Sequence, residues 1–336
     1  MTENRQKVPL VYAGALAVNR VTAHLAVLAV YLVCSGCGYI DEHTAPRKTP
    51  SAQRSPEALA ADALFWETFH QGRYENIQAT LEAETRAYLA DPRDVVSAAH
   101  IGWLHIWRLS ERRRLVEVPA TSTDDALLAR RYFQEAVDMN PEEARYLGFL
   151  ATTTLADGSL NKNERVTRRG YRELLQAIAA WPEFNLFTAG YALSARPLHS
   201  REFTQALEWQ WRDIDACVGG RIDRRNPEFS RYMHLETRTG NKRACWNSEI
   251  APHNFEGFFL NMGDMLLKAG ELQTARILYG NAKLSSSYRQ WPYRQVLEER
   301  LLLIAASANG HPVEPTAASP PLMLESAYSC MACHQQ

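Results

Sequence analysis

Glycine and proline interrupt amphipathic helical segments at recurring positions over residues 57–216 and 251–309. In "FHQGRYENIQATLEAETRAYLADP", a glycine follows one segment of helical periodicity and a proline follows the next. The layout occurs three times, at Gly72 and Pro92, at Gly158 and Pro182, and at Gly270 and Pro292. Glycine permits a tight break between antiparallel helices, and proline can open a helix because its first N–H groups need no intrahelical partner. The chain is therefore predicted to be all-α, with helical hairpins stacked into a solenoid.

A fourth stretch, "ARRYFQEAVDMNPEEARYLGFLATTTLADG", contains Ala, Phe, Ala and Pro141. Their spacing is that expected where the second helix of one hairpin is followed by the first helix of the next hairpin. Together these stretches resemble tetratricopeptide repeats, which implies a scaffold that binds other proteins. The prolines lie further apart than the roughly 34 residues of that repeat, so insertions such as "LVEVPATSTD" are needed. An irregular helical bundle with similar patterning is the alternative.

The C-terminal sequence "SCMACHQQ" contains Cys330, Cys333 and His334 in the spacing Cys-x-x-Cys-His. This spacing is typical of c-type haem attachment, in which two thiols bond the porphyrin and the adjacent imidazole reaches the iron. The chain resembles c-type cytochromes in this motif. The resemblance implies one covalent haem c on Cys330 and Cys333, with His334 as the proximal axial ligand. A chance match in a terminal tail is the alternative.

Haem c is attached outside the cytoplasm, so an export signal is expected at the N-terminus. Basic residues precede the apolar run "LAVLAVYLV", which has the length of a signal-peptide core. Ser35, Gly36 and Cys37 then resemble the lipobox of bacterial lipoproteins. The resemblance implies a signal peptide over residues 1–36 and a lipid on Cys37. Residues 37–56, rich in proline, serine and charge, are predicted to form a flexible tether.

Two alternatives remain at the N-terminus. Cys34 stands where lipoboxes usually have a branched aliphatic residue, so cleavage before Cys34 is one alternative to cleavage before Cys37. An ordinary secretory signal or an uncleaved anchor is the other.

The remaining cysteines are Cys217 and Cys245, once Cys34 leaves with the signal and the others carry lipid or haem. In an oxidising compartment a disulfide between them is the default. Residues 217–250 lack helical periodicity, are rich in glycine and arginine, and have a cysteine near each edge. They are predicted to form an irregular excursion that this disulfide closes.

Residues 310–336 are rich in proline and are predicted to form a strap that brings the haem motif back to the helical body. Because only two glutamines follow the motif, a sixth iron ligand has to come from upstream. His253 is the first candidate, since it precedes "NFEGFFLNMGDM", whose Phe255, Phe258 and Phe259 can form an apolar wall for the porphyrin. The other candidates are Met233, His234, Met262, Met265 and Met323, or no protein ligand at all.

These features predict a membrane-anchored monohaem cytochrome of the bacterial periplasm, held by its lipid at the outer membrane, that carries electrons to or from proteins docked on the helical scaffold. An assembly or sensor module with a structural or ligand-binding haem is the alternative, and a peroxidase-like enzyme is a weaker one. Electron transfer or binding is favoured over catalysis because no His/Arg pair has recognisable peroxidase spacing. The net charge of −1 gives no reason to expect a nucleic-acid partner.

Overall fold

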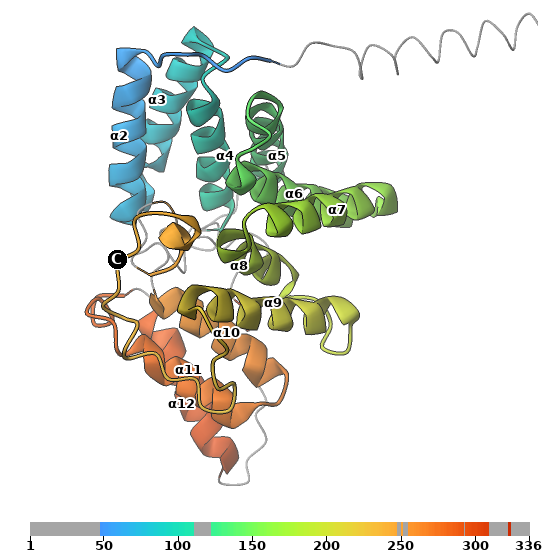
Figure 1. Cartoon of the computed structure of the whole chain (residues 1–336), viewed down its shortest axis with the longest axis vertical. Helices are drawn as coiled ribbons and strands as arrows, with labels where there is room; N and C mark the ends of the chain where they lie inside the picture. Colours follow the sequence, from blue (N-terminus) through green and yellow to red (C-terminus); the bar gives the residue numbers. More distant parts are fainter. Residues whose placement is uncertain are drawn as a thin grey trace, which may run out of the picture. The chain divides into compact units, whose positions relative to one another are not determined.

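The computed structural model describes residues 48–110, 122–246, 250, 255–291, 293–308 and 322–323. The chain divides into two compact units, residues 1–48 and 49–336, and the description below concerns the second unit. Its helices are α2 (Pro56–His70), η1 (Tyr74–Asn76), α3 (Ile77–Ala90), α4 (Val95–Ser110), α5 (Ser122–Met139), α6 (Ala144–Leu160), α7 (Glu164–Ala180), α8 (Pro182–Leu193), α9 (Arg201–Val218), η3 (Asn241–Ala244), α10 (Phe255–Lys268), α11 (Leu272–Ala282) and α12 (Arg294–Ala308) (Figure 1).

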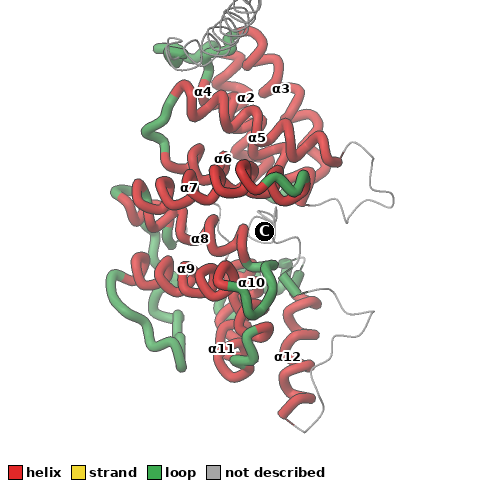
Figure 2. Tube along the Cα trace, turned by 90° about the vertical axis from the view of Figure 1, so that its right-hand side faces the viewer, coloured by secondary structure: helices red, strands yellow, loops and turns green. Residues whose placement is uncertain are grey.

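Neighbouring helices pack as successive hairpins. Helix α2 packs on α3, α4 on α5, α6 on α7, α8 on α9, and α10 on α11. Each hairpin also contacts the next one along the chain, as α5 does with α6 and α7 does with α8 (Figure 2). The part of the chain that the structure describes contains no strand. The predicted all-α helical-hairpin solenoid is therefore confirmed.

The predicted glycine breaks are confirmed at two positions and wrong at the third. Gly72 and Gly270 lie between helices with φ angles of 59° and 81°, in the left-handed region that favours glycine. Gly158 instead lies inside α6, and the break follows at Lys162, which has a φ of 50°. A Cβ atom at Gly158 would stand 2.5 Å from Thr167 Oγ1, so this glycine allows α6 and α7 to approach closely.

The other helix boundaries follow local sequence signals. Pro182 opens α8, as predicted. Helix α4 begins three residues after Pro92, where the Asp94 carboxylate accepts hydrogen bonds from the backbone N–H groups of Val96 and Ser97. Gly219, with a φ of 74°, ends α9 and begins the irregular excursion, in which η3 is the regular segment that the structure describes.

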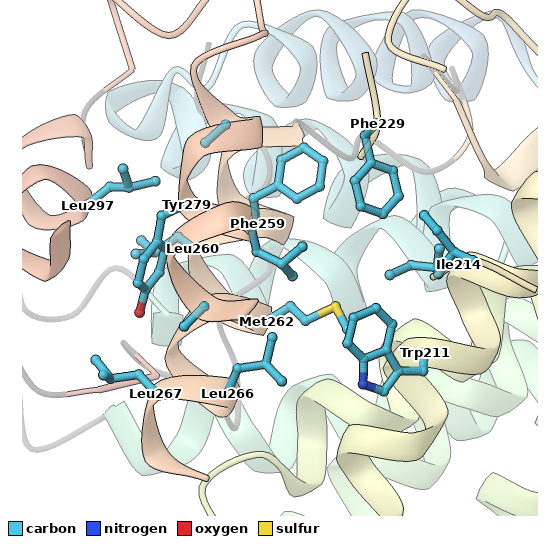
Figure 3. Packing of buried hydrophobic residues seen from close by; sticks show 14 of the residues in the cluster. Trp211, Ile214, Phe229, Phe259, Leu260, Met262, Leu266, Leu267, Tyr279 and Leu297 are labelled. Atoms are coloured by element: carbon cyan, nitrogen blue, oxygen red, sulfur yellow. The ribbon is translucent and has the colours of Figure 1, made fainter. Parts of the chain in front are cut away.

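Buried side chains form three large clusters along the stacked helices. The first cluster joins α2 to α6 and the second joins α6 to α10. The third, from α9 to α12, includes Trp211, Phe229, Phe259 and Tyr279, and Phe229 enters it from the excursion (Figure 3). The excursion is thus part of the core of the C-terminal hairpins. No helix among the described residues has both the length and the apolar character needed to cross a membrane.

Two histidines of α4 are buried within the first cluster. His100 Nδ1 lies 2.7 Å from Glu84 Oε1, and its ring stacks on Phe65 with centroids 3.7 Å apart. His105 Nδ1 lies 2.8 Å from Asp125 Oδ1. The two histidines therefore have separate carboxylate partners and hold neighbouring helices together.

Candidate functional site

Most of the predicted haem and lipid residues lie outside the described residues. These are Cys37, His253, Cys330, Cys333 and His334. The structure does describe the predicted cysteine pair, the candidate methionines, His234, the core of the aromatic helix α10 and two residues of the strap, Leu322 and Met323.

Cys217 and Cys245 form a disulfide, with Cα atoms 5.5 Å apart, at the base of the excursion. The indole Nε1 of Trp246 donates a hydrogen bond to the Cys217 carbonyl at 3.3 Å. The Tyr232 ring stacks on Trp246 with centroids 5.2 Å apart. The pairing predicted from the sequence thus fixes the excursion against the end of α9.

Asn281 of α11 also holds the excursion, and sequence reasoning missed it. Its side-chain Nδ2 donates to the Pro227 carbonyl at 2.8 Å, and its Oδ1 accepts from the Phe229 backbone N–H at 3.4 Å. Asparagine can do both because one amide group carries a donor and an acceptor. No pattern in the sequence pairs residues this far apart.

A small pocket lies beside the disulfide. Five aromatic side chains line it together with the two cysteines: Phe187, Phe229, Trp246, Phe258 and Phe259. Its volume is about 50 Å³, which is room for about three water molecules, since one needs roughly 10–15 Å³ of such space. A porphyrin does not fit inside this pocket.

The predicted aromatic wall on α10 is divided between core and surface. Phe259 is buried in the third cluster, against Phe229. Phe258 is half-buried and lies beside Phe187 of α8, with ring centroids 5.8 Å apart. The side chain of Phe255 is outside the described residues. Phe258 is therefore the described member of the wall that remains available to an apolar partner.

Asp213 of α9 contributes a buried carboxyl to the same pocket. Its Oδ1 atom has no hydrogen-bond partner among the described residues. Burial raises the pKa of Asp213 well above its usual range, and the nearby charge of Glu183 raises it further, while a backbone hydrogen bond at Phe187 acts in the opposite direction. Burial therefore disfavours the ionised form of this carboxyl in the folded protein.

The strap is anchored by a buried polar network, the strap dock, formed by Asp264, Tyr279, Arg300 and Met323. Asp264 Oδ1 accepts hydrogen bonds from Tyr279 Oη at 2.6 Å and Arg300 Nε at 3.1 Å. Asp264 Oδ2 accepts from the Met323 backbone N–H at 2.8 Å. The network therefore joins α10, α11 and α12 to the strap.

The strap dock is almost free of solvent. Asp264, Tyr279 and Arg300 are each 0% exposed. Burial raises the pKa of Asp264, and the charge of Arg300 with the three donated hydrogen bonds opposes that rise. The signal in the sequence is a carboxylate within the apolar run "FFLNMGDMLL", and burial of such a group requires a partner.

The glycine next to Asp264 makes this arrangement possible. A Cβ atom at Gly263 would stand 2.3 Å from Tyr279 Cε1. Any larger residue at this position would push the tyrosine ring away and lengthen its hydrogen bond to Asp264. Gly263 therefore serves the close approach of α11 to α10.

The candidate iron ligands within the described residues differ in accessibility. Met262 and Met265 are 0% exposed and fill the third and second clusters, which is the core-packing role usual for methionine. Met323 is 8% exposed and belongs to the second cluster. Met233 is half-buried on the excursion, and His234 beside it is exposed.

Comparison with known proteins adds no assignment. No protein-family model matches the chain. No curated protein matches it either.

Proposed function

We propose that the protein is a membrane-anchored monohaem c-type cytochrome that carries electrons between partner proteins of the bacterial cell envelope. The observation that carries the proposal is the Cys-x-x-Cys-His motif at Cys330, Cys333 and His334. The two thiols would hold the haem covalently, and the imidazole would be the proximal ligand. A bound haem supplies one-electron redox chemistry.

The strap dock supports this proposal by limiting where the motif can go. Cys330 follows Met323 by seven residues, which span at most about 25 Å when extended. The residue that fixes Met323, Asp264, is six positions from Phe258 on α10, or about 9 Å along the helix. A haem on this strap is therefore within reach of the half-buried Phe258 ring.

An apolar surface near the motif is needed because an unprotected porphyrin would expose a patch that soluble proteins usually bury or use for binding. Phe258, which lines the aromatic pocket and is half-buried, offers such a surface. His253 precedes α10 and remains the proposed sixth ligand, with the half-buried Met233 and exposed His234 as alternatives.

Haem staining of a denaturing gel, on protein matured in a host that attaches haem c, tests the proposal. Wild type is expected to stain, and Cys330→Ala or Cys333→Ala to lose most of the stain while keeping helical circular dichroism. The dichroism is expected to persist because buried side chains of the described helices already pack into three large clusters. Absence of covalent haem in wild type would overturn the proposal.

An absorption spectrum separates the carrier from a sensor or enzyme. A carrier with two axial ligands is expected to be low-spin in both oxidation states, and His253→Ala should convert it to high-spin without loss of covalent haem. A high-spin ferrous form that binds carbon monoxide in wild type would favour the sensor or enzyme.

We also propose that a lipid on Cys37 anchors the protein at the outer membrane, from the resemblance of Ser35, Gly36 and Cys37 to a lipobox. Metabolic labelling with a fatty acid tests this anchor. Cys37→Ser should abolish the label, and Cys34→Ser should not.

A further inference from the structure

A wide groove, here called the arginine groove, lies between the first turns of α7 and α9. The loop between α8 and α9 forms one of its walls. Its volume is about 1030 Å³, at the upper end of the roughly 300–1000 Å³ usual for small-molecule pockets. The groove is thus large enough for a segment of another protein chain.

Positive charge dominates the lining of the arginine groove. The groove is lined by two glutamates, Glu164 and Glu202, and by five arginines, which are Arg165, Arg168, Arg172, Arg196 and Arg201. Arg168 pairs with Glu164 at 3.0 Å, in an exposed contact that contributes little to stability. The other four arginines form no ion pair among the described residues. An excess of three positive charges is therefore directed at one concave surface.

Two helix ends add to this field. The first turn of α7, after its N-cap Asn163, and the first turn of α9, after its N-cap Ser200, both line the groove. The N-terminal end of a helix carries a partial positive charge of about half a unit. The dipoles of α7 and α9 therefore reinforce the arginines.

The groove is held in shape by contacts from α10. Lys268 Nζ donates hydrogen bonds to the carbonyls of Ser194 and Arg196, at 3.2 and 2.6 Å. The same ammonium lies 4.4 Å from the centroid of the Phe203 ring. These contacts fix the backbone of the loop at Arg196. The position from which the Arg196 side chain extends is therefore fixed as well.

The apolar floor of the groove connects to the strap. Leu155 and Leu193 line the groove and belong to the same hydrophobic cluster as Met323. Tyr171 lines the groove as well, and its ring stacks on Trp209 of that cluster. The surface thus combines arginines with an apolar floor that is continuous with the core on which the haem-bearing strap packs.

We infer that the arginine groove binds an acidic segment of a partner protein, rich in aspartate and glutamate and carrying an apolar side chain for the floor. Arginine forks match carboxylates in a bidentate manner, and fixed positive charge accelerates association with an acidic partner. A duplex or a membrane surface fits less well, because the charge lies in a concave groove and the chain as a whole has a net charge of −1. That the segment belongs to a redox partner rests on the proposed function, whereas the binding itself does not.

Fluorescence anisotropy of a labelled oligoglutamate peptide with a central leucine tests the inference, with the haem-matured full chain as receptor. We expect saturable binding that weakens with added salt. The double variant Arg172→Glu with Arg196→Glu should weaken binding at least about tenfold, because it replaces attraction with repulsion. The matched control is Arg86→Glu with Arg131→Glu. Both control positions are exposed arginines outside the groove without ion pairs among the described residues.

The control double variant changes net charge equally, so it should stay within about twofold of wild type. Arg172→Lys with Arg196→Lys keeps the charge and loses the bidentate fork, so it should weaken binding less than the charge reversal does. Equal weakening in both charge-reversed proteins would overturn the inference. So would failure of the peptide to bind while phosphatidylglycerol vesicles or duplex DNA do bind. Haem staining of the same samples separates the two proposals. If the peptide binds but the chain carries no covalent haem, the binding role of the arginine groove is supported and the cytochrome proposal is overturned.

Discussion

The carboxylate of Asp264 accepts a hydrogen bond from the backbone N–H of Met323 at 2.8 Å, although 59 positions separate the two residues. The same carboxylate pairs with Arg300 of α12, which is 0% exposed. One acidic side chain therefore fixes both the last helix and the strap that follows it. This arrangement predicts that the C-terminal hairpins and the strap depend on Asp264.

Asp264→Ala is expected to destabilise the protein by about 3–5 kcal/mol, because it leaves the Arg300 guanidinium buried without its carboxylate. Urea unfolding followed by circular dichroism measures this loss. Asp264→Leu combined with Arg300→Met removes both charges and should recover much of the stability. A single variant as stable as wild type would contradict a structural role for this ion pair.

Met323→Ala is expected to release the strap while the helical hairpins stay folded. The substitution removes a side chain packed in the second cluster, at a cost on the order of 2–5 kcal/mol for a buried methionine. Limited proteolysis should then cut near residue 323 faster than in wild type, with helical circular dichroism retained.

Met139→Ala, at a buried methionine of the first cluster, serves as the control for Met323→Ala. It should leave the rate of strap cleavage unchanged. Identical cleavage rates in wild type and both variants would show that Met323 does not hold the strap.

Asp213→Asn is expected to stabilise the protein at neutral pH. Burial raises the pKa of Asp213 in the folded state, so the folded protein holds this proton more tightly than the unfolded chain does. The raised pKa therefore adds to the free energy of unfolding of the wild type below pH 3.8, the ordinary aspartate pKa. That stabilisation is lost as the pH rises from 3.8 toward the pKa of Asp213 in the folded protein. Removing a buried carboxyl whose Oδ1 atom has no partner among the described residues is worth on the order of 1–3 kcal/mol.

Thermal unfolding of wild type and Asp213→Asn across pH measures this effect. The advantage of the variant should shrink as pH falls toward 3.8. Asp215→Asn is the control on the same helix, because Asp215 Oδ1 accepts a hydrogen bond from the Ile222 backbone N–H at 2.9 Å, and its replacement should not stabilise. A melting temperature of Asp213→Asn below wild type at neutral pH would contradict the prediction.

Removal of the Cys217–Cys245 disulfide is expected to cost roughly 3–4 kcal/mol in the chain-entropy model for a loop closed across 28 positions. The double variant Cys217→Ser with Cys245→Ser should also weaken the near-ultraviolet dichroism, since Trp246 and Tyr232 pack beside the disulfide. Denaturant unfolding measures the cost. Alkylation of the unreduced, denatured wild type should find both thiols blocked, and labelled thiols there would rule out the bridge.

Local signals in the sequence determined the all-α class and the succession of helices. Helical periodicity and the glycines at 72 and 270 act within one turn of chain, so they can be interpreted without knowing what packs against them. Elimination among six cysteines led to the Cys217–Cys245 pair. The Cys-x-x-Cys-His motif, on which the proposed haem depends, is likewise local because it lies within five consecutive residues.

Tertiary structure decided the role of Gly158, the strap dock and the arginine groove. A buried glycine inside a helix and a glycine at a break look alike in sequence, and the contact with Thr167 distinguishes them. Asp264, Arg300 and Met323 come from separate segments, as do the arginines of α7, α9 and the loop between α8 and α9. Their meeting depends on the stacking of whole hairpins, because long-range contacts arise from the summed burial of many side chains and not from any spacing along the chain.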